Sequence, residues 1–379
     1  MKSLELNEAE RLASLQLIRT ENVGPITFRQ LLGRFGSATR ALEALPDLAA
    51  RGGRKRPLRA AEPRHSEEEL ARLIKAGGGL LVIGEAAYPA ALAAIEDAPP
   101  VLALRGRKAL LSAPLATVVG ARNASTNGRR IAASLGRRLA EEGIAVVSGL
   151  ARGIDAAAHR GALDAGSETT TIAVIAGGLD RVYPPEHQAL QEEIATRGLL
   201  VSEAPLGTEP QARHFPRRNR LVSGLSLGVV VVEGALRSGS LITARMASEQ
   251  GREVMAVPGS PLDPRAQGPN SLIRQGATLV QSSDDVLECL QPLIAPPLAE
   301  APGRHAAGRA EEIPAEPAGE GSDADQAVLL DLLSPTAVPV DEVIRRCHLS
   351  PSLIQSLLLE LELAGRLERQ AGNRVALIV

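Results

Sequence analysis

The stretch Leu115-Ala116-Thr117-Val118-Val119-Gly120-Ala121-Arg122 decides the fold expected for the middle of this chain. Its first five residues are almost all apolar, which is typical of a strand buried on both faces of a parallel sheet. Gly120 ends the apolar run and Arg122 follows it, so the strand is expected to deliver an arginine to the edge of the sheet. We therefore predict an α/β domain with functional side chains at the carboxyl ends of its strands.

The same pattern recurs between about residues 115 and 290. Further apolar, β-branched runs predict strands at 144–147, 170–175, 199–202, 228–232 and 253–257. Segments of helical character lie between them, at 128–142, 154–165, 186–196 and 241–251. Strands that alternate with helices predict an extended, Rossmann-like, doubly wound and mostly parallel sheet. The short apolar runs 80–83 and 101–104 are expected to be outer strands of that sheet.

The bulk composition limits the class of protein. A length of 379 residues suggests two or three domains, and a net charge of −2 means that nucleic acid could be bound only by a local patch. Cys289 and Cys347 lie far apart, so neither a disulfide framework nor a metal site is expected. The acidic amino terminus is unlike a signal peptide, and no apolar run reaches the length of a membrane span. We expect a cytoplasmic protein without a membrane partner.

Two further domains are expected to flank the central one. Residues 1–65 predict helices interrupted at Val23-Gly24-Pro25-Ile26-Thr27, which resembles a helix-hairpin-helix (or SAM-like) domain, although a plain helical cap fits equally well. The central domain then covers 66–291, and a Pro-, Ala- and Gly-rich flexible linker covers 292–324. Residues 325–379 predict three helices and a hairpin, the pattern of a winged helix. Ser350 is placed to cap its third helix.

Five loops rich in Gly, Ser and Arg follow strands of the predicted sheet. They occupy residues 119–125, 148–155, 176–185, 237–240 and 258–261. Carboxyl ends of parallel strands meet at one edge of a sheet, where helix amino termini also converge, so these loops indicate a phosphate-rich ligand. Neither a dinucleotide-binding fingerprint nor a Walker loop is present, and we therefore expect no cofactor.

The stretch His214-Phe215-Pro216-Arg217-Arg218-Asn219-Arg220 concentrates three arginines and a phenylalanine in a chain with no Trp, two Tyr and three Phe. Arginine pairs with phosphate, and Phe215 could offer a face on which an unpaired base stacks. Pro216 suits the first turn of a helix over 217–223, whose free amides would complete an anion site. The alternative is a solvated helix start with Phe215 as a core residue.

Catalytic groups are sparse in the sequence. Asp155 and His159 are four residues apart on one expected helix, and they could form an acid–base pair or a structural hydrogen bond. Glu203 and Glu233 lie at strand ends without a partnered nucleophile nearby. We therefore expect no catalytic residue and no enzymatic activity.

The order of these motifs resembles the DNA processing protein A (DprA/Smf) family. The resemblance rests on the following segments: 118–122, 148–159, Glu203 with Pro205, 207–208, 215–220, 232–233, 237–244, 256–259, 268–270 and 272–273. It implies a homodimer that binds and protects single-stranded DNA and loads the RecA recombinase in natural transformation. It also implies a pocket that involves Arg122, Phe215, Arg218 and Arg220, with Arg217 between them.

Together, the loops and the resemblance give one set of expected DNA-binding residues: Arg122, Gly149, Arg152, Phe215, Arg217, Arg218, Asn219, Arg220, Arg237, Ser238 and Ser240. With so few aromatic residues, stacking is expected to rest on Phe215. The expected third helix of the winged helix, 351–364, carries no basic residue, which favours a protein-contact or weak duplex-binding module over a sequence reader.

Two alternative functions remain open. Rossmann-like nucleotide hydrolases of the phosphoribohydrolase type also carry glycine loops and arginines at this edge. Those enzymes place a glutamate three residues after a Gly-Thr pair, and aligning Gly239-Ser240 with that pair puts Thr243 at the glutamate position, which disfavours this alternative. The other alternative is an adaptor scaffold whose winged helix contacts partners.

Overall fold

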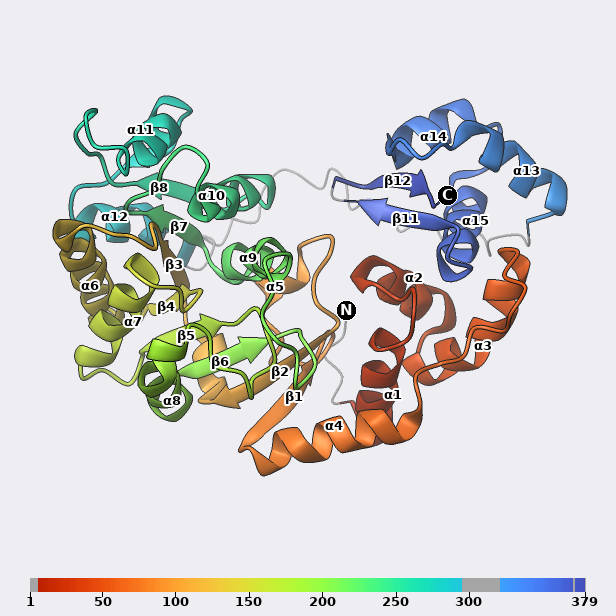
Figure 1. Ribbon diagram of the computed structural model, residues 1–379, viewed down its shortest axis with the longest axis horizontal. Helices are drawn as coiled ribbons and strands as arrows, with labels where there is room; N and C mark the ends of the chain where they lie inside the picture. Colours follow the sequence, from red (N-terminus) through yellow and green to blue (C-terminus); the bar gives the residue numbers. More distant parts are fainter. Residues whose placement is uncertain (1–5, 295–320, 371, 379) are drawn as a thin grey trace, which may run out of the picture. The chain divides into compact units, whose positions relative to one another are not determined.

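The computed structural model of the chain describes residues 6–294, 321–370 and 372–378 (Figure 1). The described residues divide into two compact units. The first, unit 1, contains residue 6 and residues 67–294. The second, unit 2, combines residues 7–66 with residues 321–378, and the boundary between the units falls within the helix α4 (Pro63–Lys75).

Unit 1 is built on a nine-stranded sheet with the spatial order β1-β2-β6-β5-β4-β3-β7-β8-β9. The strands are β1 (Gly78–Val82), β2 (Val101–Gly106), β3 (Leu115–Val119), β4 (Ala145–Ser148), β5 (Thr171–Val174), β6 (Leu199–Ser202), β7 (Gly228–Val231), β8 (Glu253–Ala256) and β9 (Thr278–Leu279). Strand β2 runs antiparallel to β1 and β6, and all other neighbours are parallel. The mostly parallel sheet expected from the sequence is confirmed, including its two outer strands.

Helices cover both faces of this sheet (Figure 1). One face packs against α6 (Thr126–Glu141), α7 (Ile154–Asp164), α8 (Gln188–Arg197) and α12 (Ser283–Ile294), and the other against α5 (Ala90–Ala93), α9 (His214–Leu225) and α10 (Gly239–Glu249). The central strand shows why its sequence is apolar throughout. In β3, Ala116 and Val118 pack in the core on the α6 and α7 side of the sheet, while Leu115 and Val119 pack in the core on the α9 and α10 side. Successive side chains of a strand point to opposite faces, so both sets are buried.

The direction of chain progression reverses between β3 and β7. From β3 the chain adds β4, β5 and β6 on one side, and it then returns to add β7, β8 and β9 on the other side. The loops that leave the carboxyl ends of β3 and β7 therefore separate, which leaves a crevice where open α/β sheets characteristically bind ligands.

Unit 2 joins the two ends of the described chain. Its amino-terminal part consists of α1 (Glu8–Ile18), α2 (Pro25–Phe35) and α3 (Ala38–Arg51). Its carboxyl-terminal part consists of α13 (Asp323–Leu332), β10 (Val338–Pro339), α14 (Val340–Arg346), α15 (Pro351–Leu363), β11 (Leu367–Gln370) and β12 (Arg374–Leu377), with strand order β10-β12-β11. This is the expected winged helix, and the Ser350 side chain accepts a hydrogen bond from the Leu353 amide as its cap.

The ends of the predicted linker 292–324 are helical, because α12 continues to Ile294 and α13 begins at Asp323. The remaining linker residues, 295–320, lie outside the described residues. Helix α9 also begins earlier than expected, at His214, with Pro216 in its first turn. Both differences arise at helix ends, which sequence periodicity locates poorly. The α-helix α11 (Gln267–Arg274) follows β8, and two short 3-10 helices occupy Lys108–Ser112 and Pro185–His187.

Candidate functional site

A cavity of about 400 Å³ opens at the carboxyl ends of β3 and β7, where the chain direction reverses. Four segments supply most of its wall: the loop after β3, the loop after β4, the first half of α9 and the start of α10. Seven of the expected site residues line it: Arg122, Gly149, Phe215, Arg218, Asn219, Ser238 and Ser240. The edge of the sheet that the glycine loops indicated is therefore where these side chains meet.

Two guanidinium groups lie close to the ring of Phe215. The guanidinium carbon of Arg122 is 4.9 Å from the ring centroid, and that of Arg218 is 5.9 Å from it. Phe215 is half-buried and lines the cavity, so it is not a core residue. Cations over an aromatic face are attracted to its quadrupole, and the arrangement combines one apolar face with two positive charges.

A second ring stands beside the first. The centroid of Tyr183 is 5.3 Å from that of Phe215, with the ring planes tilted by 57°. Tyr183 is 37% exposed, so its ring is available to solvent. The sequence assigned stacking to Phe215 alone, although the loop containing Tyr183 was among the five at this edge. The structure thus adds Tyr183 as an aromatic neighbour of Phe215. The sequence did not indicate this pair, because the two residues are 32 positions apart.

Arg218 is held in place by backbone carbonyls. Its Nη1 donates to the carbonyl oxygen of Gly149 at 2.6 Å and to that of Val174, and the side chain is buried. Burial lowers the pKa of Arg218 to about 10, while the nearby Asp155 opposes this shift. The guanidinium therefore remains charged at neutral pH and presents a fixed cation at the wall of the cavity.

Asp155 and His159 have separate partners. Asp155 accepts hydrogen bonds from the amides of Gly149 and Ala151, at 3.1 and 3.3 Å, and burial raises its pKa while Arg218 opposes the rise. The Nδ1 of His159 lies 2.7 Å from the hydroxyl of Thr171, which itself donates to the Val146 carbonyl. Nδ1 is then the protonated nitrogen. The two side chains thus hold the loop after β4 and the sheet together rather than forming an acid–base pair.

The amino terminus of α10 faces the same cavity. Ser238 is its N-cap residue, but the Ser238 side chain bonds to the hydroxyl of Ser240 at 2.8 Å rather than capping a first-turn amide. The adjacent wall includes Asn219, whose amide donates to the Gly239 carbonyl at 3.4 Å. An uncapped helix start carries partial positive charge and free N–H groups, which suits an anion.

Glu233 links the two loops that form the crevice. It follows β7, and its carboxylate accepts from the amide of Ser125 at 2.9 Å and from the Ser125 hydroxyl at 2.5 Å. Ser125 in turn caps α6 by accepting from the Gly128 amide. The carboxylate of Glu233 is therefore a structural tie across the reversal point.

Four of the expected site residues do not line the cavity. Arg152 is exposed and pairs with Glu186. Arg217 is exposed and lies 3.3 Å from Glu203, whereas Arg220 is buried between Glu203 and Asp97. Arg237 is exposed next to the start of α10.

One basic residue that the sequence did not single out, Arg265, does line the cavity, where Asp263 pairs with it in a bidentate manner. It follows the fifth glycine loop.

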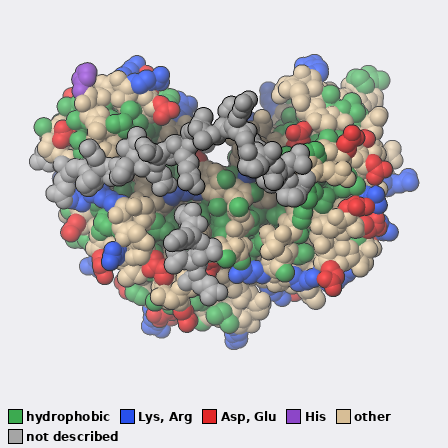
Figure 2. Space-filling model, turned by 180° about the vertical axis from the view of Figure 1, so that it is seen from behind, with side chains coloured by type: hydrophobic (Ala, Val, Ile, Leu, Met, Phe, Trp, Pro, Cys, Tyr) green, Lys and Arg blue, Asp and Glu red, His purple; other side chains and the backbone are tan. Residues whose placement is uncertain are grey.

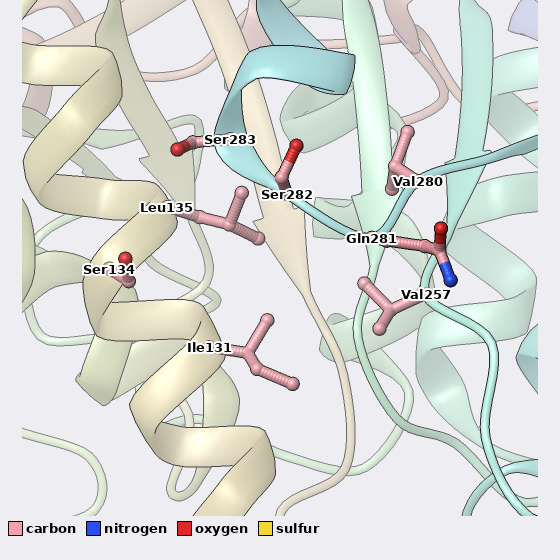
Figure 3. Close-up of a pocket in the computed structure, with 8 residues that line it drawn as sticks. All are labelled: Ile131, Ser134, Leu135, Val257, Val280, Gln281, Ser282 and Ser283. Atoms are coloured by element: carbon pink, nitrogen blue, oxygen red, sulfur yellow. The ribbon is translucent and has the colours of Figure 1, made fainter.

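On the face drawn in Figure 2, basic and acidic side chains are interspersed, with no broad basic surface. A second, smaller cavity of about 90 Å³ lies between α6 and the start of α12, and Figure 3 shows Ile131 and Leu135 facing Val257 and Val280. None of its eight described lining residues is charged. Of these two cavities, the larger one matches the chemistry of a phosphate-rich ligand.

Neither a membrane span nor a metal cluster occurs in the described part of the chain. No helix among the described residues is long and apolar enough to cross a membrane. No group of three or more His, Cys, Asp or Glu side chains within the described ranges could hold a metal ion.

Comparison with known proteins shows similarity over most of the chain. A family model described as DNA recombination-mediator protein A matches residues 79–291. Models described as a DprA-like N-terminal HHH domain and a DprA winged helix domain match residues 8–71 and 313–373. Protein Smf of Escherichia coli is 42% identical over 291 residues, which cover 76% of this chain and 75% of that protein. DNA processing protein DprA of Bacillus subtilis is 45% identical over 220 residues, covering 58% and 73%.

Solved structures agree with these matches. The X-ray structure of DprA from Streptococcus pneumoniae is similar with a TM-score of 0.63 and 35% identity, over 75% of this chain and 98% of that one. A structure of DprA from Helicobacter pylori, described for its single-stranded DNA binding mode, gives a TM-score of 0.51 and 30% identity over 57% and 96%. Because the family model covers more than half of the sequence and the fold agrees, this chain belongs to the DprA/Smf family of DNA recombination mediators.

Proposed function

We propose that this chain binds single-stranded DNA, without sequence preference, in the 400 Å³ cavity at the end of β3 and β7. The observation that carries the proposal is the ring of Phe215 flanked by Arg122 and Arg218, at 4.9 and 5.9 Å. An aromatic face with adjacent cations is the combination by which proteins hold unpaired strands. The relative from Helicobacter pylori is described as binding single-stranded DNA, which supports the same activity here.

In this proposal, different groups of the cavity bind the bases and the phosphates of the strand. A base that stacks on Phe215 would contribute about 1–3 kcal/mol, whatever its identity, because every base has a π-face. The guanidinium of Arg122, the fixed charge of Arg218 and the amino terminus of α10 would hold phosphate oxygens. Double-stranded DNA keeps its bases paired and stacked, so it cannot use the ring. Single strands are therefore expected to bind more tightly than duplexes.

Fluorescence anisotropy with labelled single-stranded and duplex oligonucleotides, over a salt series, tests the proposal. Phe215→Ala and Arg122→Ala should each raise the Kd for single strands by about tenfold or more. Arg245→Ala is a matched control, because Arg245 lies on α10 but is 80% exposed and pairs with Glu249. An unchanged Kd in both pocket variants at equal salt would reject the cavity as the binding site.

We further propose that the chain acts as a homodimer that protects the bound strand and delivers it to a RecA recombinase, as the family resemblance implies. Support for self-association comes from the large apolar side chains exposed in the β7–β9 part of unit 1: Leu236, Leu262 and Leu279. Leu262 is 93% exposed, so its side chain is available for a contact between two copies. Sedimentation of the chain alone, and nuclease protection with and without RecA, test these steps separately.

The rival hydrolase function predicts a carboxylate where this cavity has Thr243. The Thr243 hydroxyl donates to the Gly239 carbonyl at 3.4 Å, within α10. Among the described lining residues the only acid is Asp155, whose Oδ2 accepts hydrogen bonds from the amides of Gly149 and Ala151. We therefore propose a binding function without catalysis. Release of base or phosphate from nucleotides above the rate of a buffer blank would contradict it.

A further inference from the structure

The third helix of the winged helix, α15, is buried on two opposite faces. The face toward its own domain consists of four core residues: Ile354, Leu357, Leu358 and Leu361. The other face consists of four more buried residues with the same spacing: Ser356, Leu359, Glu360 and Leu363. The two sets are offset by two positions, which is roughly 200° around a helix. The second set therefore points away from the winged-helix core.

Helices α2 and α3 pack against α15 and lie beside it in Figure 1. The end of α3 approaches α15 so closely that a Cβ at Gly52 would lie 2.0 Å from the carbonyl oxygen of Glu360. Next to it, the guanidinium of Arg51 lies 3.2 Å from the carboxylate of Glu360, whose side chain is only 5% exposed. Backbone contact of this kind requires a specific fit, since no side chain separates the two helices at Gly52.

Polar groups across this interface are also paired. Asn22 donates to the Leu363 carbonyl at 3.3 Å, which satisfies an acceptor at the end of α15 that has no partner within the helix. The side-chain amides of Gln30 and Gln355 bond at 3.0 Å, and Gln326 donates to the Arg51 carbonyl at 3.2 Å. Matched hydrogen bonds along both ends of α15 indicate a specific contact rather than incidental apolar burial.

Two arginines that follow α15 in the chain take part in the same interface. Arg366 donates to the Gly52 carbonyl at 3.3 Å, and Arg369 contacts both Gln30, at 3.4 Å, and Glu362, at 2.9 Å. The other three arginines of the winged helix bond within their own domain: Arg345 to Asp341, Arg346 to Glu342 and Arg374 to Ala337. Arg366 and Arg369, which follow the third helix, are thus committed to contacts inside unit 2.

We propose that α15 is the docking surface for this chain's own amino-terminal helices, and that it does not read DNA. A winged helix that reads a duplex places this helix in the major groove and offers Arg, Lys, Asn or Gln to the bases. Of the residues of α15, all of which the structure describes, only Pro351 and Ser352 are exposed. The amino-terminal helices and the winged helix are therefore held together by noncovalent contacts. This association does not depend on the single-strand site in unit 1.

The test uses the full chain with a recognition sequence for a site-specific protease inserted within residues 295–320. After cleavage, the carboxyl-terminal fragment should still co-elute with the rest of the chain on size exclusion at micromolar concentration. Gly52→Ala should abolish co-elution, because the new methyl group has no space beside Glu360. Gly33→Ala is the matched control, since a Cβ there meets nothing within 4 Å. Arg51→Glu should also release the fragment, and adding Glu360→Arg should restore binding.

Hydrogen exchange of the intact chain supplies a second measurement. Amides of α15 should exchange slowly, and a duplex oligonucleotide should leave their exchange unchanged. Three outcomes overturn the proposal: release of the fragment from the wild-type chain, retention of the fragment in both Gly52→Ala and Arg51→Glu, or protection of α15 by duplex DNA.

Discussion

The guanidinium group of Arg218 occupies the space that a side chain at Gly149 would need. A Cβ at position 149 would lie 2.5 Å from Nη1 of Arg218, and that nitrogen donates to the Gly149 carbonyl. The glycine of this loop was expected to let the backbone approach a phosphate. Its structural role is to admit a buried cation, which then faces the cavity beside Phe215.

Gly149→Ala should therefore impair both stability and DNA binding. The added methyl group overpacks the site, which costs roughly 1–3 kcal/mol, and displaces the charge of Arg218 from the cavity. Gly79→Ala is the control, because a Cβ at that strand position meets nothing within 4 Å. Denaturant unfolding and single-strand anisotropy measure the two effects. If Gly149→Ala and Gly79→Ala had equal unfolding free energies and equal affinities for single strands, the position of the Arg218 guanidinium would not depend on a glycine at 149.

Tyr183→Ala should weaken single-strand binding, and Tyr183→Phe should not. The Tyr183 ring lies 5.3 Å from Phe215 and is exposed, so it can extend the surface on which bases stack. Its phenol group is not needed for stacking. Titration with single-stranded oligonucleotides at fixed salt checks the pair. An equal loss in Tyr183→Phe and Tyr183→Ala would instead assign the role to the hydroxyl group.

Arg220 and Arg217 should differ although they lie three residues apart on α9. The Arg220 side chain is 6% exposed and pairs with Glu203, which is 16% exposed, and with Asp97, so Arg220→Ala breaks a largely buried ion pair and should cost about 3 kcal/mol of folding stability. The Arg217 side chain is 61% exposed, and its removal should change stability by about 1 kcal/mol or less.

The two variants should also separate in the salt dependence of binding. Each phosphate neutralised on a single strand contributes about 0.7 to the slope of log K against log salt. Arg217→Ala should reduce this slope, because its exposed guanidinium is available to the strand beyond the cavity, and Arg220→Ala should leave the slope of the folded protein unchanged. A reduced slope in Arg220→Ala would show that the buried ion pair opens to DNA.

His159 should make the folded protein sensitive to acid. Burial lowers the pKa of His159 to about 3, against an ordinary value of about 6.5. As pH falls below about 6.5, the unfolded chain takes up the proton first, so the stability of the folded state declines until about pH 3. His159→Gln keeps a donor near Thr171 but does not titrate. Its free energy of unfolding should fall less than that of the wild type between about pH 7 and pH 4.5; parallel curves would contradict this assignment.

The strands of unit 1 were predictable because burial on both faces leaves an unbroken apolar run. β3 and β6 begin and end where the sequence placed them, at 115–119 and 199–202. The edge at which the functional loops gather followed from the same pattern, since carboxyl ends of parallel strands converge. Helix ends were less accurate, as at His214 and Ile294, because the apolar period does not mark the terminal turn.

By itself, the sequence determined the α/β fold, the winged helix and the loops that carry the candidate site, because local spacing of apolar residues and glycines encodes them. Only the tertiary structure decided which arginine serves which purpose. Arg217, Arg218 and Arg220 are near neighbours in sequence, yet each step along a helix turns a side chain by roughly 100°. Arg217 is therefore exposed to solvent, Arg218 lines the cavity and Arg220 lies in a buried ion pair. The pairing of Tyr183 with Phe215, and of Gly52 with Glu360, also depends on packing between segments distant in sequence, which no local pattern records.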